Sequence, residues 1–251
     1  MKDIVLIGSG NVGTHLGLSL MIQGYRIKQV WSKQLINAEI LAKKLNSTST
    51  NDLNNIKDAD LYIIAVKDDV LKSLTTELNV NNIVHTSGSI GLEVFEKQDR
   101  NYGVFYPLQT FKKDIISNLS ETPICIESNN KLFEKKLVNI ANNLTNKVVL
   151  MNSDERKQLH IAAVFSCNFV NHMFSISENI LRKSGSDFKL LIPIIDETIK
   201  KIKHNQPSKV QTGPAIRKDT KIIQDHINSL SNKDIQEIYK LISSSIMKKN
   251  E

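Results

Sequence analysis

The chain has 251 residues, of which 40% are apolar and 24% are charged, the composition of a globular protein with a buried core. Its formal net charge of +7 would suit an anionic ligand, but the lysines are scattered among acids and no block of basic residues marks a nucleic-acid-binding surface. The cysteines, Cys125 and Cys167, lie too far apart in the sequence to indicate a zinc site or a disulfide framework.

The amino-terminal half alternates strands with helices. We expect strands at residues 3–7, 26–31, 61–66, 83–86, 102–106, 124–127 and 148–151, and helices at 11–23, 38–45 and 132–144. This alternation predicts an α/β fold with a Rossmann-type, doubly wound parallel sheet. The first apolar run, residues 4–7, is too short for a signal peptide or a membrane-spanning helix, so we expect a cytoplasmic protein that does not enter a membrane.

The pattern becomes helical after Met151. Asn152 and Glu155 have the spacing of a capping box, and apolar helical periodicity continues from them for about thirty residues. Further helices are expected beyond this one, the last two at residues 216–228 and 233–247. We therefore divide the chain into a dinucleotide-binding domain, residues 1–151, and an all-α substrate and dimerisation domain, residues 152–251.

A glycine motif joins the first predicted strand to the first helix. In the G-x-G-x-x-G loop of dinucleotide-binding proteins, the first glycine permits a tight turn, the second lets the pyrophosphate approach the backbone, and the third lets the helix pack on the strand. The amides at the helix start would then hold the anion. A glycine turn without a ligand is the alternative, but the flanking strand and helix favour the binding loop. The motif residues are Gly8, Ser9, Gly10, Asn11, Val12 and Gly13.

The end of the second predicted strand favours NADP over NAD. An NAD site carries an acidic residue about 20 residues after the motif for the ribose 2′-hydroxyl, and no Asp or Glu occurs between Asp3 and Glu39. The same gap disfavours a methyltransferase or a flavoprotein. Ser32 and Lys33 stand there instead, and a hydroxyl and a cation suit a 2′-phosphate. A solvated loop lysine is the alternative interpretation of Lys33.

Ligands of open α/β sheets bind beyond the carboxyl ends of the strands, so the residues there are candidates for the rest of the site. Ala65 and Val66, at one strand end, are assigned to the cofactor. His85 and Ser87 are candidates for polarising or protonating a carbonyl or imine, and Gln109 is a candidate substrate ligand. A histidine that is merely hydrogen-bonded in place is the alternative for His85.

The long helix carries polar residues in an otherwise apolar run. At about 100° per residue they fall in an arc of roughly 120°, which faces either the cofactor cleft or, as an amide network, another helix or subunit. No metal is expected, since the two histidines are too far apart for one chelate. Beyond this helix, Arg217 is a candidate for binding a substrate carboxylate, with an ordinary loop residue as the alternative. The polar residues of the helix are His160, Asn168, Asn171 and His172.

Five stretches carry a family resemblance: IGSGNVGTHL, HTSGS, GVFYPLQTF, DERKQLHIAAVFSCNFVNH and QTGPAIRKD. Together they resemble a bacterial family of Rossmann-like NADP oxidoreductases with a carboxyl-terminal helical domain of unknown function, which implies the fold and NADP as cofactor. More distantly the chain is similar to pyrroline-5-carboxylate reductases, deazaflavin-dependent NADP reductases and β-hydroxyacid dehydrogenases. Val164 stands where a β-hydroxyacid dehydrogenase has its lysine, four residues before Asn168, so the resemblance does not carry over a lysine-based mechanism.

We therefore expect an NADPH-dependent reductase of a small carbonyl or imine substrate that acts as a homodimer through its helical domain. The alternative is a protein that binds NADP as a redox signal or as a scaffold and performs no chemistry. Polarisation of the substrate is assigned to Asn168, Asn171, His85 and Ser87, and its binding to His160, Gln109 and Arg217.

Overall fold

The computed structural model describes residues 1–95, 99–115 and 118–248. The chain divides into two compact units, Met1–Asn168 and Phe169–Glu251, and each is described here by itself. The predicted division after Met151 coincides with the end of the sheet, whereas the division between the compact units falls farther along the chain, inside a long helix.

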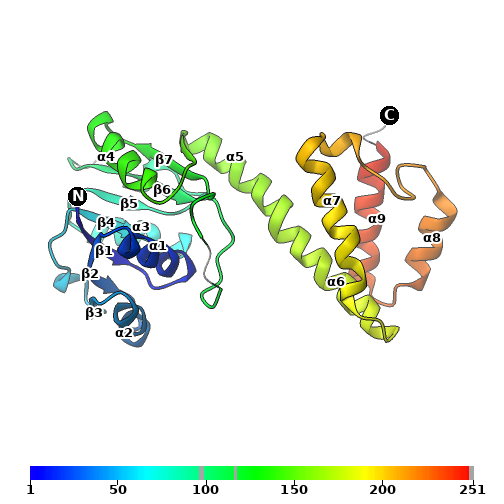
Figure 1. The fold of residues 1–251 in the computed structure, drawn as a ribbon, viewed down its shortest axis with the longest axis horizontal. Coiled ribbons are helices and arrows are strands. Elements are labelled where there is room, and N and C mark those ends of the chain that lie inside the picture. Colours follow the sequence, from blue (N-terminus) through cyan, green and yellow to red (C-terminus); the bar gives the residue numbers. More distant parts are fainter. Residues whose placement is uncertain (96–98, 116–117, 249–251) are drawn as a thin grey trace. The chain divides into compact units, whose positions relative to one another are not determined.

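The first unit is built on an eight-stranded sheet in the order β3-β2-β1-β4-β5-β6-β7-β8 (Figure 1). The order reverses between β1 and β4, and the described strands pair in parallel except for β6 with β7. This topology confirms the predicted Rossmann-type fold. The strands are β1 (Asp3–Ile7), β2 (Arg26–Trp31), β3 (Thr48–Thr50), β4 (Leu61–Ile64), β5 (Ile83–His85), β6 (Tyr102–Pro107), β7 (Ile124–Ser128) and β8 (Val148–Leu150).

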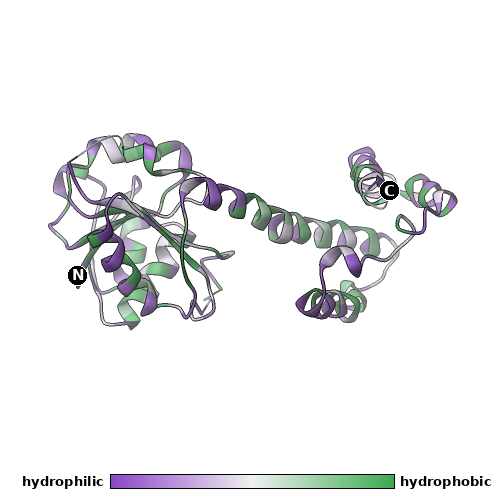
Figure 2. Cartoon of the chain, turned by 90° about the horizontal axis from the view of Figure 1, so that it is seen from above, coloured by the Kyte–Doolittle hydropathy of each residue, from purple (hydrophilic) through white to green (hydrophobic). Residues whose placement is uncertain are grey.

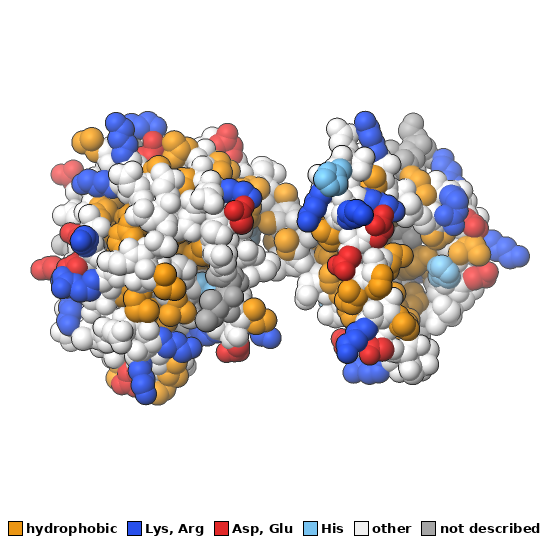
Figure 3. Space-filling model, in the orientation of Figure 1, with side chains coloured by type: hydrophobic (Ala, Val, Ile, Leu, Met, Phe, Trp, Pro, Cys, Tyr) orange, Lys and Arg blue, Asp and Glu red, His pale blue; other side chains and the backbone are white. Residues whose placement is uncertain are grey.

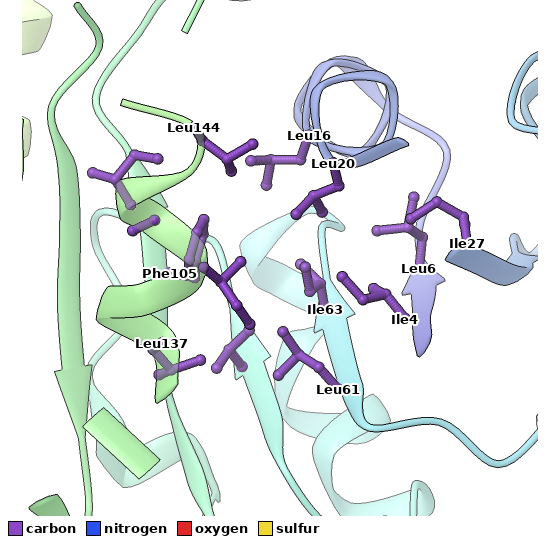
Figure 4. Close-up of a cluster of buried hydrophobic side chains, with 14 of the residues drawn as sticks. Ile4, Leu6, Leu16, Leu20, Ile27, Leu61, Ile63, Phe105, Leu137 and Leu144 are labelled. Carbon is purple, nitrogen blue, oxygen red and sulfur yellow. The ribbon is translucent and has the colours of Figure 1, made fainter. Parts of the chain in front are cut away.

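Apolar side chains of the strands point to both faces of the sheet, and helices cover both. β1 directs Ile4 and Leu6 into one cluster and Val5 and Ile7 into the other, as the two-residue repeat of a strand requires. Figure 4 shows the first cluster, in which Leu16 and Leu20 extend from the first helix and Leu16 points toward Leu144. This face carries α1 (Asn11–Ile22), α2 (Leu35–Lys44) and α4 (Lys131–Asn142), and the other carries α3 (Asp68–Glu77) and a 3₁₀ turn, Leu92–Phe95.

Three features of the sheet differ from the sequence prediction. β3 is a polar, three-residue edge strand without the apolar run on which the prediction relied. α3 is a helix where none is predicted, and it is the crossover that the parallel pair β4–β5 needs. β7 is antiparallel to β6, because the described residues of their connection, 108–123, contain no crossover helix.

One long helix follows the sheet, formed by α5 (Ser153–Ala163), a π-helical segment (Val164–Phe169) and α6 (Val170–Lys183). It starts at the predicted capping box: Asn152 Oδ1 accepts from the Glu155 amide, and Glu155 Oε2 accepts from the Asn152 amide, both at 2.9 Å. By length and composition alone, Ser153–Lys183 is also apolar enough to cross a membrane, and none of its most apolar stretch is buried in the described chain.

The second unit contains α6, α7 (Ile192–His204), α8 (Thr220–Ser229) and α9 (Lys233–Lys248). α8 packs on α9, and α6 and α7 both contact the 3₁₀ turn Phe188–Leu191 between them. The buried core of this unit is small, whereas many apolar side chains stay on the surface of its helices. Figure 2 colours the hydrophobic residues of these helices green, and Figure 3 shows hydrophobic side chains in orange on the surface. α8 starts at Thr220 instead of residue 216, because Asp219 caps it and Lys218 before it has φ +54°.

Candidate functional site

The glycine motif folds as a tight turn between β1 and α1. Gly8 has φ +116°, and a Cβ there would lie 2.2 Å from the carbonyl oxygen of Ala65. A Cβ on Gly13 would lie 2.5 Å from the carbonyl oxygen of Gly8. Real Cβ atoms do not approach oxygen so closely, so the fold itself requires glycine at both positions.

Gly10 is different, because nothing in the protein requires glycine there. A Cβ would meet only the Ala65 carbonyl oxygen, at 3.9 Å, and φ is −74°. Gly10 is the N-cap of α1, whose amino-terminal turn has neither a side-chain cap nor an acidic residue. The free amides and the positive end of this helix are the arrangement that holds a phosphate. The turn therefore fits a dinucleotide pyrophosphate, and Gly10 leaves the space for its approach.

A cleft of about 1130 Å³ borders the motif. It lies at the carboxyl ends of the central strands, where the strand order reverses between β1 and β4, as cofactor sites do in open α/β sheets. Its lining belongs entirely to the first unit. The predicted site residues that line it are Gly8, Ser9, Gly10, Asn11, Val12, Ser32, Lys33, Ala65, Val66, Ser87, Gln109 and His160.

Three predicted site residues of the first unit, Gly13, His85 and Asn168, do not line this cleft. Gly13 lies beneath the turn, against Gly8. Asn168 is exposed at the end of the first unit. Asn171 and Arg217 are exposed residues of the second unit. Within the first unit, the structure thus groups the predicted cofactor residues with Ser87, Gln109 and His160. The roles of Asn171 and Arg217, in the second unit, stay predictions.

His85 also lies outside the cleft lining, although it ends a central strand. Its side chain is completely buried and stacks on Phe95, with ring centroids 5.5 Å apart. Nδ1 accepts a hydrogen bond of 3.1 Å from the Ser87 amide. Burial, aided by the positive charge of Arg156, lowers the pKa of the imidazole to about 3. The imidazole is therefore neutral at neutral pH. This geometry agrees with the alternative interpretation of His85, a histidine that is hydrogen-bonded in place.

The polar arc predicted for the long helix assumes an uninterrupted α-helix. The π-helical segment Val164–Phe169 breaks that assumption, since its i→i+5 hydrogen bonds change the rotation per residue. His160 lies before the segment and points into the cleft lining, whereas Asn168 lies within it and Asn171 beyond it. The three side chains therefore do not continue one regular helical face.

Tyr106 lines the cleft, although no role is predicted for it from the sequence. It ends β6, and its hydroxyl lies 3.0 Å from Nδ1 of His160. The two rings meet edge to face, with centroids 5.9 Å apart. A tyrosine at the end of an apolar strand looks like a core residue in sequence, and only the fold brings it to a histidine 54 positions away.

The connection after β6 folds back onto the glycine motif. Asn11 Nδ2 donates to the Phe111 carbonyl at 2.9 Å, His15 Nε2 lies 3.0 Å from the Lys112 carbonyl, and the His15 and Phe111 rings stack at 4.7 Å. These contacts hold the connection beside the cleft, where Lys113 contributes a cation to the lining. No sequence motif singles out this lysine.

Charge is distributed unevenly around the cleft. The lining residues that follow β2 include the cation Lys33 and no acid. The acidic lining residues come instead from α3 and are Asp68, Asp69 and Glu77. Among the described residues there is no group of three or more His, Cys, Asp or Glu side chains that would hold a metal ion.

Two family models match the chain. Residues 3–87 match the model described as NADP oxidoreductase, coenzyme F420-dependent, and residues 122–246 match a domain of unknown function, DUF2520. None of the curated proteins matches it.

Solved structures match over nearly the full length. A "putative NADP oxidoreductase" from Bacteroides fragilis is 39% identical, with a TM-score of 0.93 and 98% of each chain covered. A 1-pyrroline-5-carboxylate reductase from Streptococcus pyogenes is 14% identical, with a TM-score of 0.64, covering 99% of this chain and 96% of that one. An imine reductase from Myxococcus stipitatus, in complex with NADP⁺, is 17% identical, with a TM-score of 0.62, covering 98% and 92%. The last two share the fold with this chain.

Proposed function

The chain belongs to the family of Rossmann-type NADP oxidoreductases that carry a DUF2520 domain, and from this premise we propose that it is an NADPH-dependent reductase of a small carbonyl or imine substrate. Gly10 is the observation that carries the proposal. The protein has no need of glycine at that position, whereas a phosphate that approaches the first amides of α1 does.

The end of β2 supports NADP over NAD. Ser32 and Lys33 line the cleft there, and no acidic side chain from this strand end competes for the ribose 2′ position. A lysine attracts the 2′-phosphate, and a hydroxyl donates a hydrogen bond to it. NAD has an uncharged 2′-hydroxyl in place of the 2′-phosphate, so it offers no charge to Lys33. The preference for NADP over NAD therefore comes from the adenosine ribose alone.

Residues of the chain would bind and orient both reactants. The motif amides hold the pyrophosphate, and the Ser87 and Gln109 side chains offer polar contacts farther along the cleft. The Ser87 hydroxyl already accepts from the Ser89 and Ile90 amides at 3.1 and 3.0 Å, so its own hydrogen is free to point at a substrate oxygen or nitrogen. When bound, NADPH supplies the hydride.

We also propose that the protein is a soluble, cytoplasmic homodimer formed through its helical region. Within a single chain Ile161 and Phe165 of the long helix are 50% and 65% exposed, and α7 exposes Ile194 to 65%. Helices this apolar need a partner surface. Size-exclusion chromatography with light scattering tests this: twice the 28.3 kDa chain mass is expected, and a monomer at micromolar concentration would contradict it.

Calorimetry with NADPH and NADH tests the cofactor assignment. We expect NADPH to bind at least about tenfold more tightly, because one charge-assisted contact contributes about 1.5–3 kcal/mol. Lys33→Ala should abolish this preference while leaving NADH affinity unchanged, and Lys44→Ala, an exposed lysine of α2 outside the cleft, is the matched control. Equal affinities for both coenzymes in the wild type would refute the NADP preference.

Oxidation of NADPH with a panel of keto acids, aldehydes and cyclic imines tests the reductase assignment. Turnover of at least one of these carbonyl or imine compounds is expected. Tight NADPH binding without turnover of any of them would instead favour a protein that senses NADP and performs no chemistry.

A further inference from the structure

A tyrosine and a histidine from different elements form a polar couple in the wall of the cofactor cleft. Tyr106 comes from the end of β6 and His160 from the second turn of α5, and the hydroxyl and Nδ1 are 3.0 Å apart. Both side chains line the cleft. Neither phenol nor imidazole is needed for the fold of a strand end or a helix, so the pairing calls for another explanation.

Gly88 shows that the protein makes room for this couple. A Cβ at Gly88 would lie 2.6 Å from Nδ1 of His160 and 2.8 Å from Cζ of Tyr106. Its φ is not in the left-handed region, so the backbone conformation does not demand glycine. The two rings therefore account for the glycine, and Gly88 itself borders the cleft beside them.

A buried ion pair fixes the helix that carries the histidine. Arg156, one turn before His160, is completely buried, and its guanidinium donates to the Glu127 carboxylate of β7 and to the Ile90 carbonyl, the latter at 2.6 Å. The Ser153 hydroxyl also donates to Glu127, at 2.8 Å. α5 is thus bound to the sheet at its first turn, and His160 is held at a set distance from β6.

Tyr106 is protonated at neutral pH, as a proton donor must be. Burial raises the pKa of Tyr106 to about 12, so the phenol keeps its proton at neutral pH. When Nδ1 of His160 carries a proton, it donates to the phenolic oxygen, and the Tyr106 hydrogen is free to point into the cleft. A hydrogen bond received by the oxygen also stabilises the phenolate that forms when Tyr106 gives its proton away.

We propose that Tyr106, backed by His160, is the proton donor to the substrate, an inference that rests on the reductase function proposed above. As the substrate carbon accepts the hydride from bound NADPH, the carbonyl oxygen or imine nitrogen takes the Tyr106 proton. The phenolate oxygen then takes the proton from Nδ1 of His160, which is replenished from solvent. The products are an alcohol or an amine and NADP⁺, and the substrate class is a compound whose C=O or C=N heteroatom fits beside the phenol.

Tyr106→Phe tests the donor, and Tyr102→Phe is its matched control on the same strand, since Tyr102 stacks on Phe95 and does not line the cleft. With glyoxylate and 1-pyrroline as probes, Tyr106→Phe should slow single-turnover NADPH oxidation by at least about a hundredfold. Calorimetry should give an unchanged NADPH affinity, and melting should give an unchanged Tm. The control should match the wild type in all three measurements.

His160 is a positioning residue in this mechanism. Its test therefore needs a measurement that a purely structural role of His160 would not affect. His160→Ala should lose rate to a similar degree, and added imidazole should restore part of it. In ligand-free protein labelled with ¹⁵N-histidine, Tyr106→Phe should shift the His160 Nδ1 resonance and Tyr102→Phe should not.

The outcomes separate this inference from the proposed function. If the wild type reduces a probe and Tyr106→Phe does so equally fast, the donor role is wrong and the reductase stands. If the wild type binds NADPH but reduces neither probe nor any other compound of the keto acid, aldehyde and cyclic imine panel, the reductase proposal fails and the donor role falls with it. An unmoved Nδ1 resonance in Tyr106→Phe would show that the couple does not form in solution, which overturns the inference directly.

Discussion

Replacing Gly10 by alanine separates cofactor binding from folding. An alanine Cβ at this position would meet the Ala65 carbonyl oxygen at 3.9 Å, an ordinary van der Waals contact, and nothing nearer. Alanine is a poorer N-cap residue than glycine by about 1 kcal/mol, and the smaller entropy of the unfolded alanine chain offsets about half of that loss or more. We therefore expect the free energy of unfolding to change by less than about 1 kcal/mol, or a Tm shift below about 4 °C.

In the proposed cofactor site, the same methyl group would stand where the pyrophosphate approaches the start of α1. If it displaces the phosphate from two backbone amides, the loss is about 3 kcal/mol, because each hydrogen bond to a charged group is worth about 1.5–3 kcal/mol. This corresponds to at least about a hundredfold increase in Kd for NADPH. Calorimetry measures the Kd, and melting followed by circular dichroism measures the Tm of the same sample.

Gly13→Ala is the contrasting control. Its Cβ would lie 2.5 Å from the Gly8 carbonyl oxygen, a clash between backbone atoms that the fold must relieve at a cost of about 1–3 kcal/mol. We expect this variant to lose stability, with a lower Tm than Gly10→Ala. Wild-type NADPH affinity in Gly10→Ala would refute the assignment of this loop to the pyrophosphate, whatever the two melting temperatures.

Two further predictions concern buried polar groups. Arg156→Met leaves the Glu127 carboxylate without its buried partner, so we expect the free energy of unfolding in urea to fall by about 3–5 kcal/mol. Lys131→Met breaks an exposed ion pair and should change that free energy by less than about 1 kcal/mol. His85 has a folded pKa of about 3, below its unfolded value of 6.5, so protonation favours the unfolded state and stability falls as the pH drops from about 6.5 towards 3. Between pH 7 and 5, protonation of this histidine in the unfolded state should lower the free energy of unfolding by about 2 kcal/mol. Over the same pH change, the urea midpoint of His85→Asn should fall less than that of the wild type. An equal fall in both proteins would contradict the buried neutral ring.

The nucleotide-binding half could be predicted from the sequence because its signals are local. The apolar run 4–7, the glycines that follow it and the helix after them specify β1, the turn and α1 without reference to distant residues. The capping box at Asn152 and Glu155 is equally local, and the structure confirms it. The lack of acid after the second strand could likewise be counted directly.

Features that depend on distant partners could not be predicted. The antiparallel β7 follows from the path of a long connection, and the π-helical segment follows from a hydrogen-bond shift that no residue pattern marks. Tyr106 acquires its partner only when β6 and α5 meet. The burial of His85 is likewise a property of the fold, since nothing in the sequence around this strand end shows that its side chain is completely buried.

Amide NMR of ¹⁵N-labelled protein titrated with NADPH tests the central claim most directly, that a dinucleotide lies against the amino-terminal turn of α1. The account predicts that the largest shifts occur at the amides of Gly10, Asn11 and Val12, with further shifts at Ser32 and Lys33. If millimolar NADPH leaves the amides of the turn unmoved, the cofactor site is wrong.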